Sequence, residues 1–244
     1  MPKERLDIWL VQQGLAESRE QAQRLVLAGQ VQVAGQLADK AGHRYDTALP
    51  LAVQALPRFV SRGGDKLEAA FAAFPLDAAG RICVDVGAST GGFTDCLLQH
   101  GAARVYAVDV GRGQLHWKLR NDPRVVCIEQ VNARYLSAAA VPERPTLAVV
   151  DVAFISLTLI LPPLLGVLAE PADIVTLIKP QFEAGPRDVG RGGVVRSEAV
   201  RQAVIDRLRA FGQDELRLKW LGCCTSPLKG PAGNVEFLAW WRHG

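Results

Sequence analysis

The fold can be inferred from one stretch of the sequence, Ile82-Cys83-Val84-Asp85-Val86-Gly87-Ala88-Ser89-Thr90-Gly91-Gly92. Its apolar beginning predicts a buried strand, its glycines a tight loop, and residues 93–98 the helix that follows. A strand, a glycine-rich loop and a helix in this order form a cradle for a nucleotide, because glycine lets the backbone approach a ligand without an intervening Cβ. We therefore expect a ligand at the carboxyl end of this strand.

After this stretch, short apolar runs alternate with helical or loop segments. Strands are predicted at 105–108, 125–128, 147–150, 174–178, 218–220 and 235–241, and a helix is predicted from Lys66 to Phe74. Alternation of this kind is typical of a mostly parallel sheet with helices on both faces. The last two strands flank the loop 226–233, so we expect an antiparallel finish. That finish favours the seven-stranded Rossmann-like α/β fold of class I methyltransferases over a dinucleotide-binding sheet.

The first quarter of the chain predicts a separate small α+β domain. One helix carries Leu6, Trp9 and Leu10 and ends at Gly14; a second begins at a Ser18–Gln21 capping box and ends at Gly29. A strand at 31–33 turns at 34–36, and the prolines of residues 49–58 favour an extended linker. We therefore divide the chain into residues 1–58 and 59–244.

Composition indicates an ordinary globular protein of 244 residues, 49% apolar and 22% charged, with net charge +3. No apolar stretch is long enough to span a membrane, and the N-terminus leads into no signal-peptide core, so we expect a cytoplasmic protein. The five cysteines show no Cys-x-x-Cys pair and are interpreted as reduced thiols. The four histidines are dispersed, so no metal site is predicted.

The glycine loop favours S-adenosylmethionine over NAD as its ligand. Its spacing is not the dinucleotide Gly-x-Gly-x-x-Gly, and S-adenosylmethionine has no pyrophosphate to place on the helix N-terminus. Asp109 ends the next strand, where a carboxylate accepts hydrogen bonds from ribose hydroxyls. Asn132 follows the third strand and is placed to meet the adenine edge. The predicted donor-binding residues are Asp85, Gly87, Ala88, Ser89, Gly91, Gly92, Phe93, Asp109, Asn132 and Asp151.

Four charged residues lie at the expected catalytic edge of the sheet: Lys66, Asp151, Lys179 and Glu236. A ribose hydroxyl is a poor nucleophile at neutral pH and needs deprotonation and in-line alignment with the methyl group. A Lys-Asp-Lys-Glu set can supply both. Lys179 is the candidate base or proton-accepting orienter in this site.

Basic residues indicate an RNA partner. They crowd the first quarter of the chain and recur in the glycine-rich segment 185–196, which we interpret as a lid that meets RNA phosphates or as a flexible surface loop. Trp117 and Phe182 could stack on a base or belong to the core. The predicted RNA-binding residues are Arg5, Arg19, Arg24, Lys40, Arg62, Arg187, Arg191 and Arg196.

Long motifs resemble the TlyA (hemolysin A) family of RNA methyltransferases. They are the segments 85–95, 107–111, 114–115, 117–120, 151–157, 178–183, 192–196, 226–227, 230–231 and 233–237, while residues 5–7, 14–19, 22 and 29–35 resemble an S4-type RNA-binding domain. Ala34, Asp65 and Ala153 depart from the usual residues. The resemblance implies 2′-O-methylation of ribosomal RNA, usually on a cytidine ribose, in free RNA or ribosomal subunits. It also places Lys66, Asp151, Lys179 and Glu236 on the tetrad of ribose methyltransferases.

Three other functions compete with this interpretation. A haemolytic, membrane-acting protein is disfavoured by the lack of a spanning or long basic amphipathic helix. A catalytically silent RNA-binding module is disfavoured by the intact tetrad. An NAD enzyme is disfavoured by the glycine spacing and by the absence of a constellation for hydride transfer.

Overall fold

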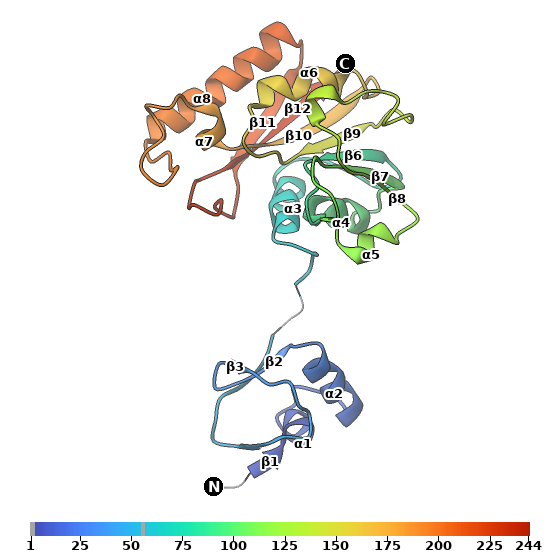
Figure 1. Ribbon diagram of the computed structural model, residues 1–244, viewed down its shortest axis with the longest axis vertical. Helices are drawn as coiled ribbons and strands as arrows, with labels where there is room; N and C mark the ends of the chain where they lie inside the picture. Colours follow the sequence, from blue (N-terminus) through green and yellow to red (C-terminus); the bar gives the residue numbers. More distant parts are fainter. Residues whose placement is uncertain (1–2, 55–56) are drawn as a thin grey trace. The chain divides into compact units, whose positions relative to one another are not determined.

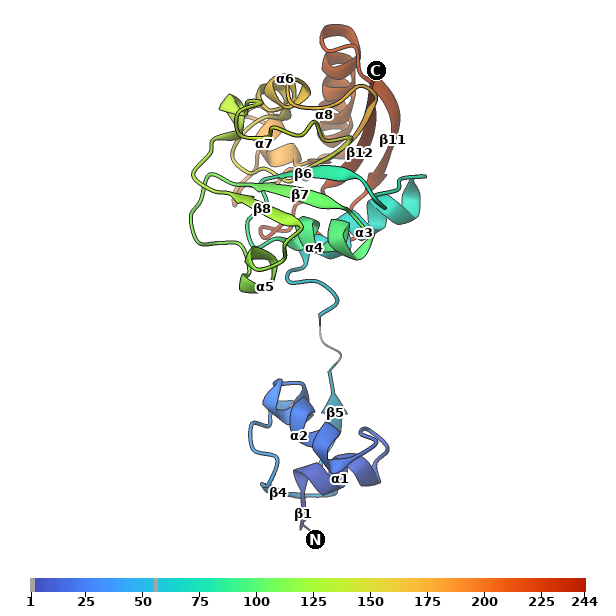
Figure 2. The ribbon, with the colours of Figure 1, turned by 90° about the vertical axis from the view of Figure 1, so that its right-hand side faces the viewer.

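The computed structural model describes residues 3–54 and 57–244, and its chain divides into two compact units, Met1–Arg58 and Phe59–Gly244. Each unit is shown in Figures 1 and 2. None of the described helices is both long and apolar enough to cross a membrane.

The N-terminal unit packs two short helices against small antiparallel sheets. Its elements are β1 (Lys3–Arg5), α1 (Leu6–Gln12), α2 (Arg19–Leu27), β2 (Val31–Val33), β3 (Gln36–Leu37), β4 (Arg44–Asp46) and β5 (Leu51–Val53). Strand β1 pairs with β4, and β2 lies between β3 and β5. Leu6, Trp9 and Leu10 of α1 are buried with Val26 and Val31. The two predicted helices and the strand at 31–33 are therefore present.

Local details of this unit differ from the prediction in two places. Residues 51–53 of the expected linker form β5, because their half-buried side chains pack on the core while their backbone pairs with β2. Residues 55–56 of that linker lie outside the described residues. At the start of α2, the side chain of Ser18 accepts a hydrogen bond from the N–H of Gln21, but the Gln21 side chain accepts from Glu17 rather than closing the box on Ser18.

The C-terminal unit is built on the predicted seven-stranded sheet, with the order β11-β12-β10-β9-β6-β7-β8. The strands are β6 (Ile82–Val86), β7 (Arg104–Val108), β8 (Val125–Ile128), β9 (Leu147–Val150), β10 (Ala172–Ile178), β11 (Lys219–Thr225) and β12 (Phe237–His243). Five strands run parallel; β12 is antiparallel to β10 and β11 is antiparallel to β12. The expected antiparallel finish is confirmed.

Helices cover both faces of this sheet. The helical segments are α3 (Gly63–Ala73), α4 (Gly92–Gln99), α5 (Trp117–Arg120), η1 (Ala133–Tyr135), η2 (Leu157–Leu159), α6 (Leu161–Leu165), α7 (Pro180–Glu183), α8 (Glu198–Ala210) and η3 (Phe211–Glu215). Figures 1 and 2 show α3, α4 and α5 on one face and α6, α7 and α8 on the other.

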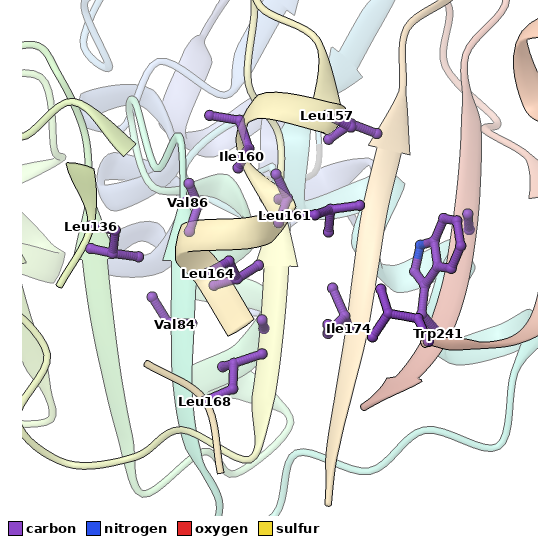
Figure 3. Packing of buried hydrophobic residues seen from close by; sticks show 14 of the residues in the cluster. Val84, Val86, Leu136, Leu157, Ile160, Leu161, Leu164, Leu168, Ile174 and Trp241 are labelled. Carbon is purple, nitrogen blue, oxygen red and sulfur yellow. The ribbon is translucent and has the colours of Figure 1, made fainter. Parts of the chain in front are cut away.

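Side chains of β6 alternate between two cores, as a doubly covered strand requires. Val84 and Val86 pack with Leu161 and Leu164 of α6 on one face, as Figure 3 shows. Cys83 packs on the other face with residues of α3 and α4. Apolar side chains on both faces fix the register of the central strands. The polar residues that directly follow these parallel strands therefore lie at one edge of the sheet.

Candidate active site

The predicted charged residues meet at one edge of the sheet because of its topology. Asp151 and Lys179 directly follow the neighbouring parallel strands β9 and β10. Strand β12 runs the opposite way, so its beginning lies at this same edge, with Phe237 paired to Ile178. Glu236 was predicted inside the last strand; it lies one residue before β12, in the loop that faces the cavity.

Two short ion pairs organise these four residues. Nζ of Lys179 lies 2.5 Å from Oδ1 of Asp151, and Nζ of Lys66 lies 2.6 Å from Oε2 of Glu236. The lysine side chains are each 12% exposed, and Glu236 is 1% exposed, so the Lys66–Glu236 pair is almost completely removed from bulk water. All four residues line one cavity of about 360 Å³, together with Ser61, Arg62, Lys229 and the glycine loop. We name it the acceptor cavity.

A second cavity of about 560 Å³ adjoins the first, and we name it the donor cavity. The two share Gly87, Ser89, Asp151 and Ala153 in their walls. The donor cavity is otherwise lined by apolar side chains with a few polar groups among them, the composition usual for small-molecule sites. The Asp151 carboxylate, which pairs with Lys179, therefore lies between the two cavities.

Polar groups of the donor cavity are held by backbone hydrogen bonds. Asp109 accepts from the N–H of Ser89 at 2.8 Å and from the N–H of Gly111 at 2.7 Å. Because each carboxylate oxygen has a second lone pair, Asp109 can still accept bonds from a ligand. Asn132 uses its Oδ1 to cap η1 through the N–H of Arg134, which leaves its amide nitrogen as the donor for a ligand.

The glycines of the loop also allow close packing within the protein. Gly87 has φ +87°, and a Cβ there would collide with the carbonyl oxygen of Asp151. A Cβ on Gly91 would collide with Leu119, and one on Gly92 with Ser61. These glycines therefore allow neighbouring parts of the protein to pack closely, and Gly87 and Gly92 also line the acceptor cavity. Gly91 lies in the wall of neither cavity.

Asp85, predicted to contact the donor, lies beneath the loop and outside both cavity walls. Its side chain is fully buried, and Oδ2 accepts a hydrogen bond from Oγ1 of Thr94 at 2.7 Å. Burial raises the pKa of this carboxyl to about 7, and the negative charges of Asp151 and Asp109 add to that shift. Oδ1 is buried without a hydrogen-bond partner in the described part of the chain, a feature that calls for a bound group or a proton.

The remaining predicted donor residues divide between the cavities. Ala88 and Phe93 line the acceptor cavity, Asp109 and Asn132 line the donor cavity, and Asp151 lines both. The cradle therefore spans the boundary between the two cavities.

The arginine-rich segment 185–196 is fastened to the active-site edge by Asn234. The Asn234 side chain is buried; its Oδ1 accepts from the N–H of Val195 at 2.9 Å, and its Nδ2 donates to the carbonyl of Gly193 at 2.8 Å. Asn234 lies two residues before Glu236, so the arginine segment and the Lys66–Glu236 pair share one support. Arg187, Arg191 and Arg196 are exposed on the segment, and Arg62 is exposed at the acceptor cavity.

Two of the predicted RNA contacts in the N-terminal unit are organised by one carboxylate. Asp7 is fully buried and accepts hydrogen bonds from Arg5, Arg19 and Gln23. The hydrogen bond from Arg5 is the main reason that the pKa of Asp7 lies far below its ordinary value. The guanidinium groups of Arg5 and Arg19 are thus oriented, while Arg24 and Lys40 project from the surface.

Comparison with known proteins identifies the family of each unit. The FtsJ-like methyltransferase family matches residues 59–243, and the S4 domain family matches residues 4–48. The chain belongs to the FtsJ-like methyltransferase family. Within it, the chain is a member of the TlyA (hemolysin A) group.

Named relatives of this FtsJ-like chain span nearly its whole length. It is 48% identical to the 16S/23S rRNA (cytidine-2′-O)-methyltransferase TlyA of Mycobacterium tuberculosis, covering 98% of this chain and 89% of the relative. It is 44% identical to Hemolysin A of Brachyspira hyodysenteriae, covering 96% and 98%. A solved structure from Streptococcus thermophilus, provisionally described as a hemolysin, is 47% identical, with a TM-score of 0.75 over 99% of this chain and 89% of that one.

Several wall residues of this FtsJ-like site were missed from the sequence. Lys229 lines the acceptor cavity from the loop before β12, and nothing in its local pattern distinguishes it from a surface lysine. Phe154 lines the donor cavity with φ +62° and 89% exposure, and its ring lies 4.8 Å from that of Phe182. Trp117 is 71% exposed, so the alternative that it belongs to the core is wrong.

Proposed function

We propose that this chain transfers a methyl group from S-adenosylmethionine to the 2′-hydroxyl of a cytidine ribose in ribosomal RNA. The observation that carries the proposal is the shared wall of the two cavities, where Asp151 belongs to both and pairs with Lys179. A methyl donor on one side then lies next to an acceptor hydroxyl on the other. The relative from M. tuberculosis, whose name states this reaction, supports the substrate class.

The donor cavity fits the parts of S-adenosylmethionine. Asp109 would accept hydrogen bonds from the ribose hydroxyls, and Asn132 would donate to the adenine edge. Val110, Val131 and Ile155 offer apolar surface for the adenine ring. When bound, the donor supplies an electrophilic methyl group on a sulfonium.

The acceptor cavity supplies the proton acceptor and its orientation. Lys179, after its ammonium has lost a proton to solvent, would take the proton of the 2′-hydroxyl while the oxygen forms its bond to the methyl carbon and the carbon–sulfur bond breaks. Asp151 holds the Lys179 nitrogen in place at 2.5 Å. Lys66, fixed by Glu236, would hold the ribose or its phosphate on the opposite wall.

RNA binding would be divided between two surfaces. The N-terminal unit, matched by the S4 family, presents Arg5, Arg19, Arg24 and Lys40. The segment held by Asn234, two residues before Glu236, presents Arg187, Arg191 and Arg196. Contacts of this kind to phosphates position the RNA and carry no base specificity of their own.

Transfer of a labelled methyl group to separated ribosomal subunits and to their free RNA tests the proposal. A 2′-O-methyl group blocks alkaline cleavage of the adjacent phosphodiester, so the label is expected in alkali-resistant dinucleotides that contain cytidine. Label recovered in alkali-released mononucleotides would show methylation of a base and contradict the proposal. RNA binding with no transfer to any subunit would favour the silent RNA-binding module instead.

A further inference from the structure

Three side chains of classes that bind metal ions converge between α3 and α4, away from the active-site cavities. Glu68 projects from α3, while Cys96 and His100 lie four residues apart on α4 and its C-terminal cap. Residues four apart in a helix lie on the same face. Helices α3 and α4 pack against each other, so the Cys96–His100 face meets Glu68. None of the three lines the donor or acceptor cavity.

The ligand atoms of this cluster already lie close together. The carboxylate of Glu68, Sγ of Cys96 and a ring nitrogen of His100 all lie within 4.8 Å of one another. Oε2 of Glu68 is 2.7 Å from Nε2 of His100 and 3.7 Å from the Cys96 sulfur. The His100 ring is stacked on Phe71, with centroids 4.0 Å apart and planes 12° from parallel, which limits its rotation.

From this arrangement we propose that Glu68, Cys96 and His100 form a binding site for a zinc-class transition metal ion. Thiolate, imidazole and carboxylate are the ligands that Zn²⁺ uses, whereas Mg²⁺ and Ca²⁺ prefer oxygen ligands alone. One thiolate and one carboxylate carry two negative charges, which a divalent cation neutralises.

The distances suit a four-coordinate ion after a small adjustment. Bond lengths of about 2.0–2.3 Å in a tetrahedron put the ligand atoms roughly 3.4–3.6 Å apart. The Cys96–Glu68 separation of 3.7 Å is close to that value, and the His100–Glu68 pair would open from its hydrogen-bonded 2.7 Å. This hydrogen bond keeps the ligands gathered in the metal-free protein.

Exposure of the cluster provides a route for the ion and its fourth ligand. Cys96 is fully buried, and the side chains of Glu68 and His100 are each 30% exposed. An ion can therefore enter from the Glu68–His100 side, and a water molecule from solvent would complete the coordination there. Three protein ligands and one water form a common zinc arrangement.

The consequence of binding would be a clamp between two helices that frame the active site. Helix α3 carries Lys66, two residues before Glu68, and α4 begins at Gly92 of the glycine loop. An ion that joins Glu68 to Cys96 and His100 would stabilise the spacing of these helices without touching either substrate. The site thus goes beyond the proposed methyl transfer and does not depend on it.

Metal titration of the full-length protein tests this inference. Zn²⁺, freed of chelators, is titrated by calorimetry, and Co²⁺ is used as a coloured substitute whose thiolate bond gives a charge-transfer absorption. The wild-type protein is expected to bind one ion with that absorption. His100→Gln and Cys96→Ser are expected to weaken binding by more than the roughly 10- to 100-fold that loss of an outer-shell partner costs. Saturating Zn²⁺ should raise the melting temperature of the wild type but not that of His100→Gln or Cys96→Ser.

Cys127→Ser is the matched control, because Cys127 is a half-buried cysteine on β8 outside the cluster. It should keep full metal binding and the Co²⁺ absorption. His100 is partly exposed, so His100→Gln keeps the test valid if Cys96→Ser does not fold. Wild-type protein that binds Zn²⁺ no better than His100→Gln, or a Co²⁺ complex without thiolate absorption, would overturn the inference and leave the cluster as a hydrogen-bonded helix contact.

Discussion

Lys66 and Glu236 are separated by most of the C-terminal unit in sequence, yet Nζ of Lys66 lies 2.6 Å from Oε2 of Glu236. The pair joins the first turns of α3 to the loop before β12. With side-chain exposures of 12% and 1%, both charges are removed from most of the surrounding water. Each charge therefore depends on the other for stabilisation.

Breaking this pair from one side is expected to destabilise the fold. Lys66→Met leaves the buried Glu236 carboxylate without its cation, which typically costs about 3–5 kcal/mol. Adding Glu236→Gln removes the orphaned charge, so the double variant should be more stable than Lys66→Met alone while remaining inactive. Urea unfolding of both single variants and the double variant measures the coupling. Stability losses that simply add would show that the two charges do not interact.

Asp109→Ala is expected to weaken binding of S-adenosylmethionine. A hydrogen bond to a charged group contributes about 1.5–3 kcal/mol, and Asp109 is a donor-cavity carboxylate held by the N–H of Ser89 in the glycine loop. Calorimetry of donor binding measures the loss, and RNA binding should be unchanged. Asp122→Ala is the control, because Asp122 pairs with Arg124 and lines neither cavity. Equal donor affinity in both variants would contradict the assignment, as would tighter binding of NAD.

Asp85 is expected to make stability depend on pH. The pKa of Asp85 is raised from 3.8 to about 7, so between these values the folded state holds a proton that the unfolded state has lost. Its contribution to stability therefore falls as pH rises through this window. Asp85→Asn removes the ionisable group, so its stability relative to the wild type should increase from about pH 5 to about pH 8. A difference that stays constant with pH would show that Asp85 does not titrate there.

Removal of residues 1–58 should reduce RNA affinity far more than donor affinity. The N-terminal unit presents Arg24 and Lys40 on its surface. Its Arg5 and Arg19 are oriented by ion pairs with Asp7. Each lost phosphate contact lowers the salt dependence of binding, by about 0.7–0.9 in the log–log slope. RNA affinities of the full chain and the truncated chain, measured over a range of salt, should show the smaller slope for the truncated chain. Equal slopes would contradict this division of labour.

Much of the fold was predictable because buried parallel strands are continuous apolar runs. The runs at 82–86 and 147–150 have this character, and their ends placed Asp151 at the correct edge. Strand β5 was missed because Leu51–Val53 is short and follows a proline. Its pairing with β2, more than fifteen residues earlier, decides its structure, and propensity alone does not contain that information.

Roles that depend on distant neighbours were less accessible from the sequence. Gly91 is required because Leu119 packs against it, and Asp85 is covered by the helix that carries Thr94. The two hydrogen bonds of Asn234 to the arginine segment likewise join residues about forty positions apart. Residue type and spacing predict which groups reach the edge of the sheet, whereas packing decides which of them face the cavity.

The proposal that Lys179 accepts the proton of the 2′-hydroxyl is tested by measuring both the rate of methyl transfer and the donor affinity of Lys179→Ala. Lys179 lines the acceptor cavity and pairs with Asp151, while Asp109 and Asn132 line the donor cavity. Loss of a positioned proton acceptor typically lowers the rate by about 10²–10⁴-fold, so transfer should be nearly abolished with donor binding close to that of the wild type. Lys179→Arg should not rescue, because a guanidinium stays protonated. Turnover near that of the wild type in either variant would contradict the account.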